Sequence, residues 1–241
     1  MNTCVAHRGW SGKAPENTIA AFQLAIDHPA IFAIELDVHL SKDGVPVVIH
    51  DHSVNRTTNG SGRVIDLTVE ELRELDAGSW FGTEFSGERI PLLEEVLEMT
   101  KGKKRVLIEL KQMGSYYTGL EQKVVELIQK FSLQDEVLII SFDHESLRKI
   151  KAFETDVQTG LIYLGMPTLL LEQAAYTGAN HLSFHHSFLT KEIVEKLISN
   201  NIEIGAWTID EMESLERIKA LSSNIHITTN HPEIMIYQFE K

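Results

Sequence analysis

Short runs of hydrophobic residues recur along the chain, separated by longer stretches in which hydrophobic positions repeat every three or four residues. The short runs are rich in Ile, Val and Leu, a composition typical of buried strands. We therefore predict strands over residues 4–7, 33–38, 105–110, 137–142, 158–163, 180–184, 202–207 and 225–229.

The stretches between these strands have helical periodicity. The predicted helices cover residues 17–27, 92–100, 119–131, 145–153, 168–176, 190–200, 211–221 and a last segment after Pro232. Strands that alternate with helices form parallel βαβ units. This pattern in 241 residues favours an α/β protein with a (β/α)8 TIM-type barrel, as a single domain over residues 1–241. A doubly wound open sheet is the alternative, because the repeat length suits both.

One connection is much longer than the others. Residues 39–104 separate the second predicted strand from the third, which is too long for a simple βα loop. Asp43-Gly44 is a strong hairpin signal, and the hydrophobic run VPVVIHD follows it. We expect a hairpin within a small inserted segment, about residues 41–91, that covers one end of the barrel. With Asp43 and Gly44 as a two-residue turn, His50 would lie opposite Asp37.

Titratable side chains interrupt the predicted strands near their carboxyl ends. Glu35 and Asp37 are two residues apart in the second strand, and Glu109 and Lys111 are two apart at the end of the third. Residues two apart on a strand share a face, and active sites of barrels form at the carboxyl ends of the strands. The same reasoning brings three further residues to this rim, namely His7, Arg8 and His50.

Three carboxylates at one rim repel one another and are costly to bury. One divalent cation with oxygen ligands, Mg²⁺ or Ca²⁺, would resolve both difficulties. The alternative is that Arg8 and Lys111 neutralise the carboxylates without a metal. The joint occurrence of these groups at matching strand ends favours a site over separate ion pairs.

Aromatic residues and histidines also end strands at this rim. Phe142 and Trp207 are either core residues or an apolar wall for the carbon skeleton of a substrate, and we favour the wall. His185 and His186 follow the sixth predicted strand and either face the site or form an ordinary loop pair.

The net charge of −13 argues against the basic surface that nucleic acids or anionic membranes require. An anionic substrate would therefore need a local positive site. Cys4 is the only cysteine, so neither an intrachain disulfide nor a cysteine-based zinc site is possible. The N-terminus does not resemble a secretory signal, and no hydrophobic run approaches the length of a membrane span. We expect a soluble, cytoplasmic protein without stable membrane association.

Several short motifs stand in order along the chain. They are HRG at 7–9, PENT at 15–18, ELDV at 35–38, SKDGVPVVIHD at 41–51, RTTNGSG at 56–62, IPLLEEVL at 90–97, IELK at 108–111 and WTID at 207–210. Each motif is short, but their combination resembles the glycerophosphodiester phosphodiesterase family over nearly the whole chain. The resemblance is densest in residues 5–111.

The resemblance implies a TIM-type barrel with a small insertion after strand two, and metal-dependent hydrolysis of glycerophosphodiesters to sn-glycerol 3-phosphate and an alcohol. It implies an acid/base pair, a set of metal ligands and two phosphate contacts. The acid/base pair matches His7 and His50. The metal ligands match Glu35, Asp37 and Glu109, and the phosphate contacts match Arg8 and Lys111. Glu16 and Asn17, in the motif that supports the first histidine loop, are grouped with the substrate-binding residues, together with Phe142 and Trp207.

Two motifs depart from the family pattern. Family members often read T-V-N after the tryptophan, where this chain has Thr208-Ile209-Asp210. They often end on T-D-x-P, where this chain has Thr229-Asn230-His231-Pro232. Since both motifs lie outside the metal and histidine set, we expect these departures to affect the leaving group of the substrate more than the reaction.

The implied reaction has a simple chemical route. The glycerol moiety carries a hydroxyl beside the esterified one, and intramolecular attack by it is favoured by proximity. Histidines suit the proton transfers, because their pKa lies near neutrality. The alternatives are a lysophospholipase D-type phosphodiesterase on the same site, a barrel that binds a phosphorylated ligand without turnover, and a metal-dependent aldolase or isomerase. The sequence leaves open the alcohol head group and the oligomeric state.

Overall fold

The computed structural model describes residues 2–154 and 156–236. Its parallel strands close into a barrel in the order β1-β9-β8-β7-β6-β5-β4-β2, and β1 pairs with β2 to complete the ring. The strands are β1 (Thr3–Ala6), β2 (Ile31–Leu40), β3 (Pro46–Val48), β4 (Arg105–Leu110), β5 (Val137–Ser141), β6 (Gln158–Tyr163), β7 (His181–His185), β8 (Glu203–Trp207) and β9 (Ile225–Thr229). The predicted (β/α)8 barrel is confirmed.

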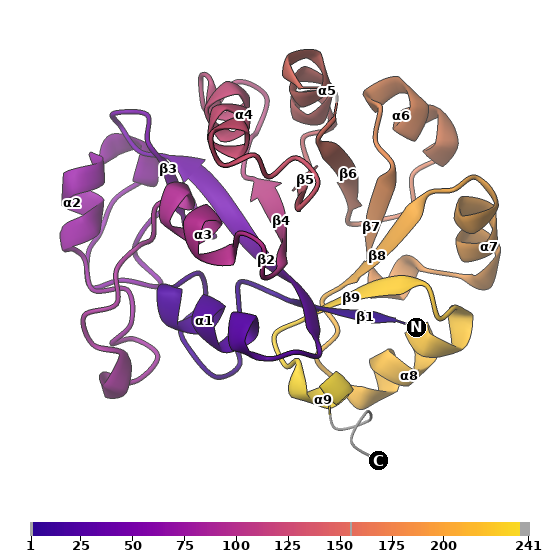
Figure 1. Ribbon diagram of the computed structural model, residues 1–241, viewed down its shortest axis with the longest axis horizontal. Helices are drawn as coiled ribbons and strands as arrows, with labels where there is room; N and C mark the ends of the chain where they lie inside the picture. Colours follow the sequence, from indigo (N-terminus) through magenta and orange to yellow (C-terminus); the bar gives the residue numbers. More distant parts are fainter. Residues whose placement is uncertain (1, 155, 237–241) are drawn as a thin grey trace.

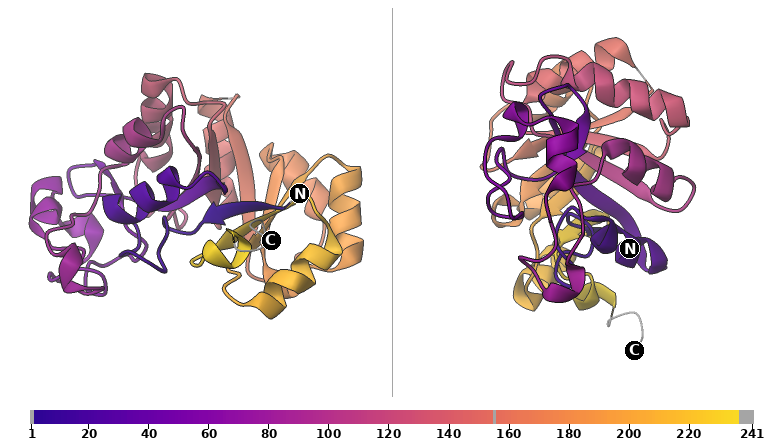
Figure 2. Two further views of the ribbon diagram at one scale, coloured as in Figure 1. Left: turned by 60° about the horizontal axis from the view of Figure 1, so that its bottom comes forward. Right: turned by 90° about the vertical axis from the view of Figure 1, so that its left-hand side faces the viewer.

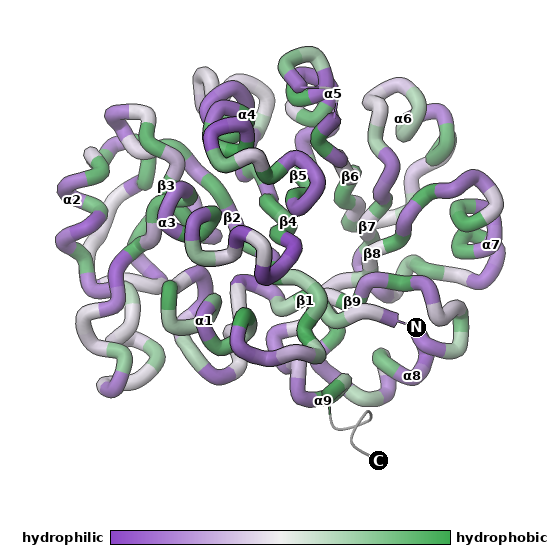
Figure 3. Tube along the Cα trace, viewed as in Figure 1, coloured by the Kyte–Doolittle hydropathy of each residue, from purple (hydrophilic) through white to green (hydrophobic). Residues whose placement is uncertain are grey.

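Helices surround the barrel on the outside (Figure 1). They are α1 (Ile19–Asp27), α2 (Val69–Glu74), α3 (Leu93–Thr100), α4 (Leu120–Phe131), α5 (His144–Phe153), α6 (Leu170–Thr177), α7 (Lys191–Ser199), α8 (Met212–Leu221) and α9 (Glu233–Ile236). Hydrophobic and hydrophilic residues alternate along these helices (Figure 3), because one side packs on the strands and the other faces solvent. None of the described helices combines the length and the hydrophobicity needed to cross a bilayer.

The long connection between β2 and β4 contains β3, α2, α3 and two 3₁₀ turns, Val64–Asp66 and Thr83–Phe85. Its first part projects from one side of the barrel (Figures 1 and 2). Helix α2 was not among the predicted elements, although its start carries a recognisable signal. The Thr68 hydroxyl accepts from the Glu71 N–H, and the Glu71 carboxylate accepts from the Thr68 N–H. This reciprocal pair is a capping box.

The predicted pairing of the hairpin is wrong by one residue. Strand β3 pairs antiparallel with β2 so that Val48 faces Val38, and the Ile49 N–H donates to the Asp37 carbonyl at 3.1 Å. The loop has three residues rather than two, because the Ser41 hydroxyl accepts from the Val45 N–H and draws these two residues opposite each other. Gly44 takes the left-handed conformation, with φ of 76°, that closes such a loop.

The inserted segment has its own small hydrophobic cluster. This cluster comprises Val47, Ile49, Val54, Val64, Leu72, Ala77 and Ile90, all buried. It lies apart from the large cluster between strands and helices, and from the smaller one inside the barrel around Val5, Leu107 and Ile140. The segment that carries His50 is therefore anchored by its own packing.

This packing predicts the effect of one truncation. Leu72 is fully buried in the inserted segment, so Leu72→Ala should lower the free energy of unfolding by about 2–5 kcal/mol through lost burial and a residual cavity. Urea denaturation measures this loss. Leu24→Ala, at a position that is 40% exposed on α1, is the matched control and should change stability by less than about 0.5 kcal/mol. Equal losses in the two variants would contradict the assigned packing.

Candidate active site

Most of the residues singled out in the sequence meet at a cavity of about 280 Å³ at the carboxyl ends of the barrel strands. Its lining includes His7, Arg8, Glu35, His50, Glu109, Lys111, Phe142 and Trp207. The structure thus brings together side chains from β1, β2, β4, β5 and β8 and from the end of the hairpin. Asp37 does not line the cavity; it is fully buried beside Glu35 and Glu109.

The three carboxylates form one compact group. Glu35, Asp37 and Glu109 each offer a carboxylate oxygen, and these oxygens lie within 4.8 Å of one another. Lys111 is placed between two of them, with its Nζ 2.8 Å from Asp37 and 2.5 Å from Glu109. One oxygen of Glu35, Oε1, is buried and has no hydrogen-bond partner in the described part of the chain. Such an orphaned acceptor is unusual for a buried polar atom.

The electrostatics of this group are asymmetric. Burial raises the pKa of Asp37, but the charges of Lys111 and Arg8 together outweigh it, so that this pKa lies well below its ordinary value. Burial and the neighbouring carboxylates raise the pKa of Glu35 far above its usual range. Burial also raises the pKa of Glu109, despite the contact with Lys111. Asp37 is thus the permanent anion, and the two glutamates hold protons more readily unless a further cation is present.

The turn after β1 brings Arg8 to the cavity. Arg8 has a positive φ of 55°, which is uncommon for a residue with a side chain, and Gly9 follows with φ of 77°. A Cβ at Gly9 would lie 2.6 Å from the backbone of Ala21, so the turn requires glycine there. In this conformation the Arg8 N–H donates to Glu35 at 3.0 Å, and its guanidinium lies 3.3 Å from Asp37.

Glu16 and Asn17 do not line the cavity. They support the residues that do. Glu16 accepts from the Arg8 guanidinium at 2.9 Å and also binds Arg56. Asn17 donates to Asp37 at 2.7 Å through its amide nitrogen. Both side chains therefore fix groups of the cavity from behind.

In each cavity histidine, Nδ1 contacts a neighbouring side chain, and Nε2 is the nitrogen available for proton transfer. His7 Nδ1 is 2.7 Å from the amide oxygen of Asn230, so its N–H donates there and Nε2 carries the lone pair. His50 Nδ1 donates to Asp51 at 2.7 Å, and Asp51 in turn binds Arg56. Burial lowers the pKa of His7 to about 4, so this imidazole is neutral at pH 7.

A third histidine, which the sequence reasoning missed, supports His50. His39 is fully buried on β2, two residues beyond Asp37, and its Nε2 is 3.0 Å from the His50 carbonyl. Its Nδ1 is 2.7 Å from the hydroxyl of Tyr117. The alternation Glu35, Asp37, His39 on one strand face was the available signal.

The apolar side of the cavity is formed by Phe142 and Trp207, whose rings meet edge to face with centroids 5.6 Å apart. Neither His185 nor His186 lines the cavity. His185 packs against the ring of Trp207, and His186 contacts Arg217.

The two departures from the family pattern meet behind His7. Asn230 donates its amide to Asp210 at 2.6 Å, and the Asp210 carboxylate also accepts from the Asn230 N–H. The asparagine and aspartate of the family pattern are therefore exchanged between the two positions, and in this chain the two residues contact each other. The expectation that these departures affect mainly the leaving group finds no support in these contacts, because the pair holds His7.

Known proteins are similar to this chain over nearly its whole length. The sequence profile described as the Glycerophosphoryl diester phosphodiesterase family matches residues 7–234. A glycerophosphodiester phosphodiesterase of Caldanaerobacter subterraneus subsp. tengcongensis is 42% identical over 234 residues, covering 96% of this chain and 95% of the relative. One of Bacillus altitudinis is 37% identical, covering 97% and 96%.

A solved structure is similar over the whole chain. The Oleispira antarctica phosphodiesterase, determined in complex with the product sn-glycerol-3-phosphate, has a TM-score of 0.93 and 30% identity. The similarity covers 100% of this chain and 98% of that one.

The exchanged pair leads to a prediction about His7. In the double variant Asp210→Asn/Asn230→Asp, a carboxylate would accept from His7 Nδ1 in place of a neutral amide oxygen. An adjacent negative charge favours the imidazolium, so we expect the pKa of His7 to rise from about 4 by about 1–3. NMR titration of the metal-free protein measures this value, with the other histidine resonances as internal controls. An unchanged or lower pKa of His7 would contradict the assigned hydrogen bond.

Proposed function

The chain belongs to the glycerophosphoryl diester phosphodiesterase family and is an enzyme of that class, and from this premise we propose that it hydrolyses small-molecule glycerophosphodiesters to sn-glycerol 3-phosphate and an alcohol. The observation that carries the proposal is the convergence of two histidines, two glutamates and the basic side chains of Arg8 and Lys111 on one cavity, with the carboxylate of Asp37 close to both glutamates. The product complex of the similar Oleispira antarctica enzyme supports the same substrate class.

One divalent cation would be held by Glu35, Asp37 and Glu109. The residues fit such an ion because they offer only oxygen donors within 4.8 Å of one another, and because the buried Glu35 Oε1 has no other partner in the described chain. Oxygen ligands of this kind favour Mg²⁺ or Ca²⁺. When bound, the cation would supply positive charge that polarises the phosphodiester and stabilises its transition state.

The phosphate group of the substrate would contact Arg8 and Lys111, which both line the cavity. Their charges oppose the repulsion that an anionic substrate meets from a chain of net charge −13. Arg8 is held by Glu16 and Asp37, and Lys111 by Asp37 and Glu109. Both cations are thus preorganised, which is the arrangement that stabilises developing charge effectively.

Catalysis would proceed in two steps. One histidine takes the proton from the glycerol hydroxyl beside the ester, the hydroxyl oxygen bonds to phosphorus, and the bond to the leaving alcohol breaks. The other histidine donates a proton to that alcohol. Water then opens the cyclic phosphate with the proton transfers reversed, which returns both imidazoles to their starting states. The Nδ1 contacts of His7 and His50 leave Nε2 of each ring for these transfers.

The carbon skeleton of the substrate would lie against Phe142 and Trp207. A second candidate substrate class is a lysophospholipid. The observation that favours it is the exposure of Leu164 and Phe142 at the cavity, 69% and 47% respectively, because an acyl chain would cover such side chains.

Metal removal tests the reaction class. After EDTA treatment, release of sn-glycerol 3-phosphate from glycerophosphocholine should be lost, and added Mg²⁺ or Ca²⁺ should restore it. Choline release from lysophosphatidylcholine, measured in parallel, separates the two substrate classes. Inactivity on both substrates with every metal added would overturn the proposed function in favour of a binding role.

Truncation of either histidine tests the acid/base assignment. His7→Ala and His50→Ala should each lower kcat by about 10²-fold or more, because general acid–base catalysis contributes about 10²–10⁴. The control is His28→Ala, at the end of α1 outside the cavity, and it should leave kcat unchanged. Near-normal turnover in either cavity variant would refute its assignment.

A further inference from the structure

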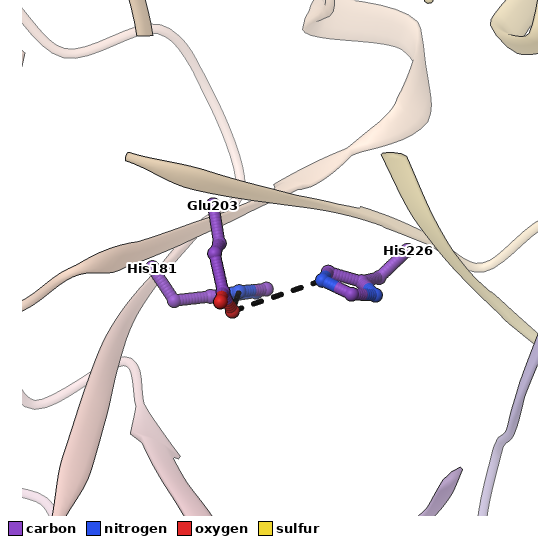
Figure 4. Close-up of side chains that lie close together, drawn as sticks. All are labelled: His181, Glu203 and His226. Carbon is purple, nitrogen blue, oxygen red and sulfur yellow. Dashed lines mark ion pairs between the residues drawn. The ribbon is translucent and has the colours of Figure 1, made fainter. Parts of the chain in front are cut away.

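A second group of metal-ligating side chains lies at the opposite end of the barrel. His181 begins β7, Glu203 begins β8 and His226 is the second residue of β9. Their side chains point toward one another between three neighbouring strands (Figure 4). We call these three residues the basal cluster.

The strands place the basal cluster inside the barrel. Residues two apart on a strand share a face, and Ser183, Trp207 and Thr228, two or four residues further along these strands, line the catalytic cavity. His181 lies opposite Glu203 in the register of β7 and β8, and His226 lies opposite Gly205 in that of β8 and β9. The two ends of the same three strands therefore carry two separate polar groups.

The distances in the basal cluster suit metal coordination rather than hydrogen bonding. His181 Nδ1 and His226 Nε2 each lie 3.7 Å from the same oxygen of Glu203, Oε2. This separation is too long for a hydrogen bond. Ligand atoms about 2.1 Å from a tetrahedral ion are separated by roughly 3.4 Å, so small side-chain movements would close the site around one ion.

The basal cluster also contains buried polar atoms without partners. His181 is 1% exposed, and neither of its ring nitrogens has a hydrogen-bond partner within the described residues. Glu203 Oε2 likewise has no hydrogen-bond partner among these residues. Since buried polar atoms in folded proteins nearly always have a partner, these atoms indicate that a ligand completes the group.

Neighbouring residues make room for the imidazoles and orient them. A Cβ at Gly205 would lie 2.8 Å from His181 Nε2, and one at Gly160 would lie 2.9 Å from His181 Cδ2. His226 Nδ1 is 2.6 Å from the Thr3 hydroxyl. In the tautomer that donates this N–H to Thr3, Nε2 directs its lone pair toward Glu203, which is the usual support of a metal-binding histidine.

An ordinary ion-pair network is the competing interpretation. Arg105 Nη1 lies 3.9 Å from Glu203 Oε2, and its guanidinium also donates to Gln158. A guanidinium has only donors and offers a metal no ligand, so its charge opposes metal binding. It makes no hydrogen bond to His181 among the described contacts, however, so the network leaves both ring nitrogens of this buried imidazole without a partner.

We propose that the basal cluster binds one transition-metal dication of the zinc class. Two imidazole nitrogens and one carboxylate oxygen suit Zn²⁺ and its neighbours, whereas Mg²⁺ and Ca²⁺ prefer oxygen donors alone. A cavity of about 400 Å³, lined in part by Thr3, Glu203 and His226, gives the ion a route from solvent and room for a water ligand. The bound ion would join β7, β8 and β9 at the end remote from the catalytic cavity.

Cobalt substitution of the full chain tests this proposal without an activity assay. Co²⁺ would be titrated into EDTA-stripped protein in a large excess of Mg²⁺, which competes for the all-oxygen site. We expect one Co²⁺ per chain, with the intense visible absorption of a four-coordinate nitrogen and oxygen site. Glu203→Gln and His226→Gln should lose this band, and His28→Gln should retain it as the matched histidine control.

A second readout covers variants that fold poorly. Zn²⁺ in excess Mg²⁺ should raise the Tm of the wild-type chain, because a ligand that binds only the folded state stabilises it. The rise should be absent in Glu203→Gln. Either no Co²⁺ band in the wild-type chain or a band that persists in both cluster variants would overturn the proposal.

Discussion

The charge balance around Asp37 is the constraint on which the catalytic end of the barrel depends. A buried carboxylate group is costly unless it is compensated, and here Lys111 and Arg8 contact Asp37 while Asn17 donates to it. These contacts fix the positively charged side chains of Arg8 and Lys111, which would bind phosphate. They compensate one carboxylate fully and leave Glu35 and Glu109 with raised pKa values. A divalent cation would replace the protons on these glutamates, so metal affinity and pH are linked at this site.

The barrel turns this local balance into a complete site because its strands run parallel, so that their carboxyl ends meet at a common rim. Strand β2 alone supplies Glu35, Asp37 and His39 on one face, and the hairpin that follows returns His50 to the same place. The inserted segment holds that hairpin through its own hydrophobic cluster, which has little to do with the barrel core. Arg56, from the same segment, then joins Asp51 to Glu16. His50 is therefore positioned by contacts that reach back to Arg8, whereas His7 is held by Asn230.

Local pattern predicted the elements well, since strands over residues 105–110, 158–163 and 225–229 coincide with β4, β6 and β9. It failed where a side chain decided the geometry, as when the Ser41 hydroxyl closed a three-residue hairpin loop. It also failed where partners are far apart in the chain. Asn230 is separated from His7 by 223 positions, and only the closure of the barrel brings them together. The alternation of His181 with Ser183, and of Glu203 with Gly205, is visible in the sequence, but it predicts only strands, because the three basal residues come from three different strands.

The two ends of the barrel differ in the kind of donor they present, and this difference separates the ions that each could hold. The catalytic rim offers carboxylate oxygens beside Lys111 and Arg8, which suits a hard, strongly hydrated cation in contact with phosphate. The basal cluster offers imidazole nitrogens in a site that Arg105 borders, which favours an ion that gains more from nitrogen ligands than it loses by repulsion. Strands β7, β8 and β9 each carry inward-facing residues of both groups, one group at each end of the barrel. Gly205 lies between them on β8, and its missing side chain leaves the space that His181 occupies.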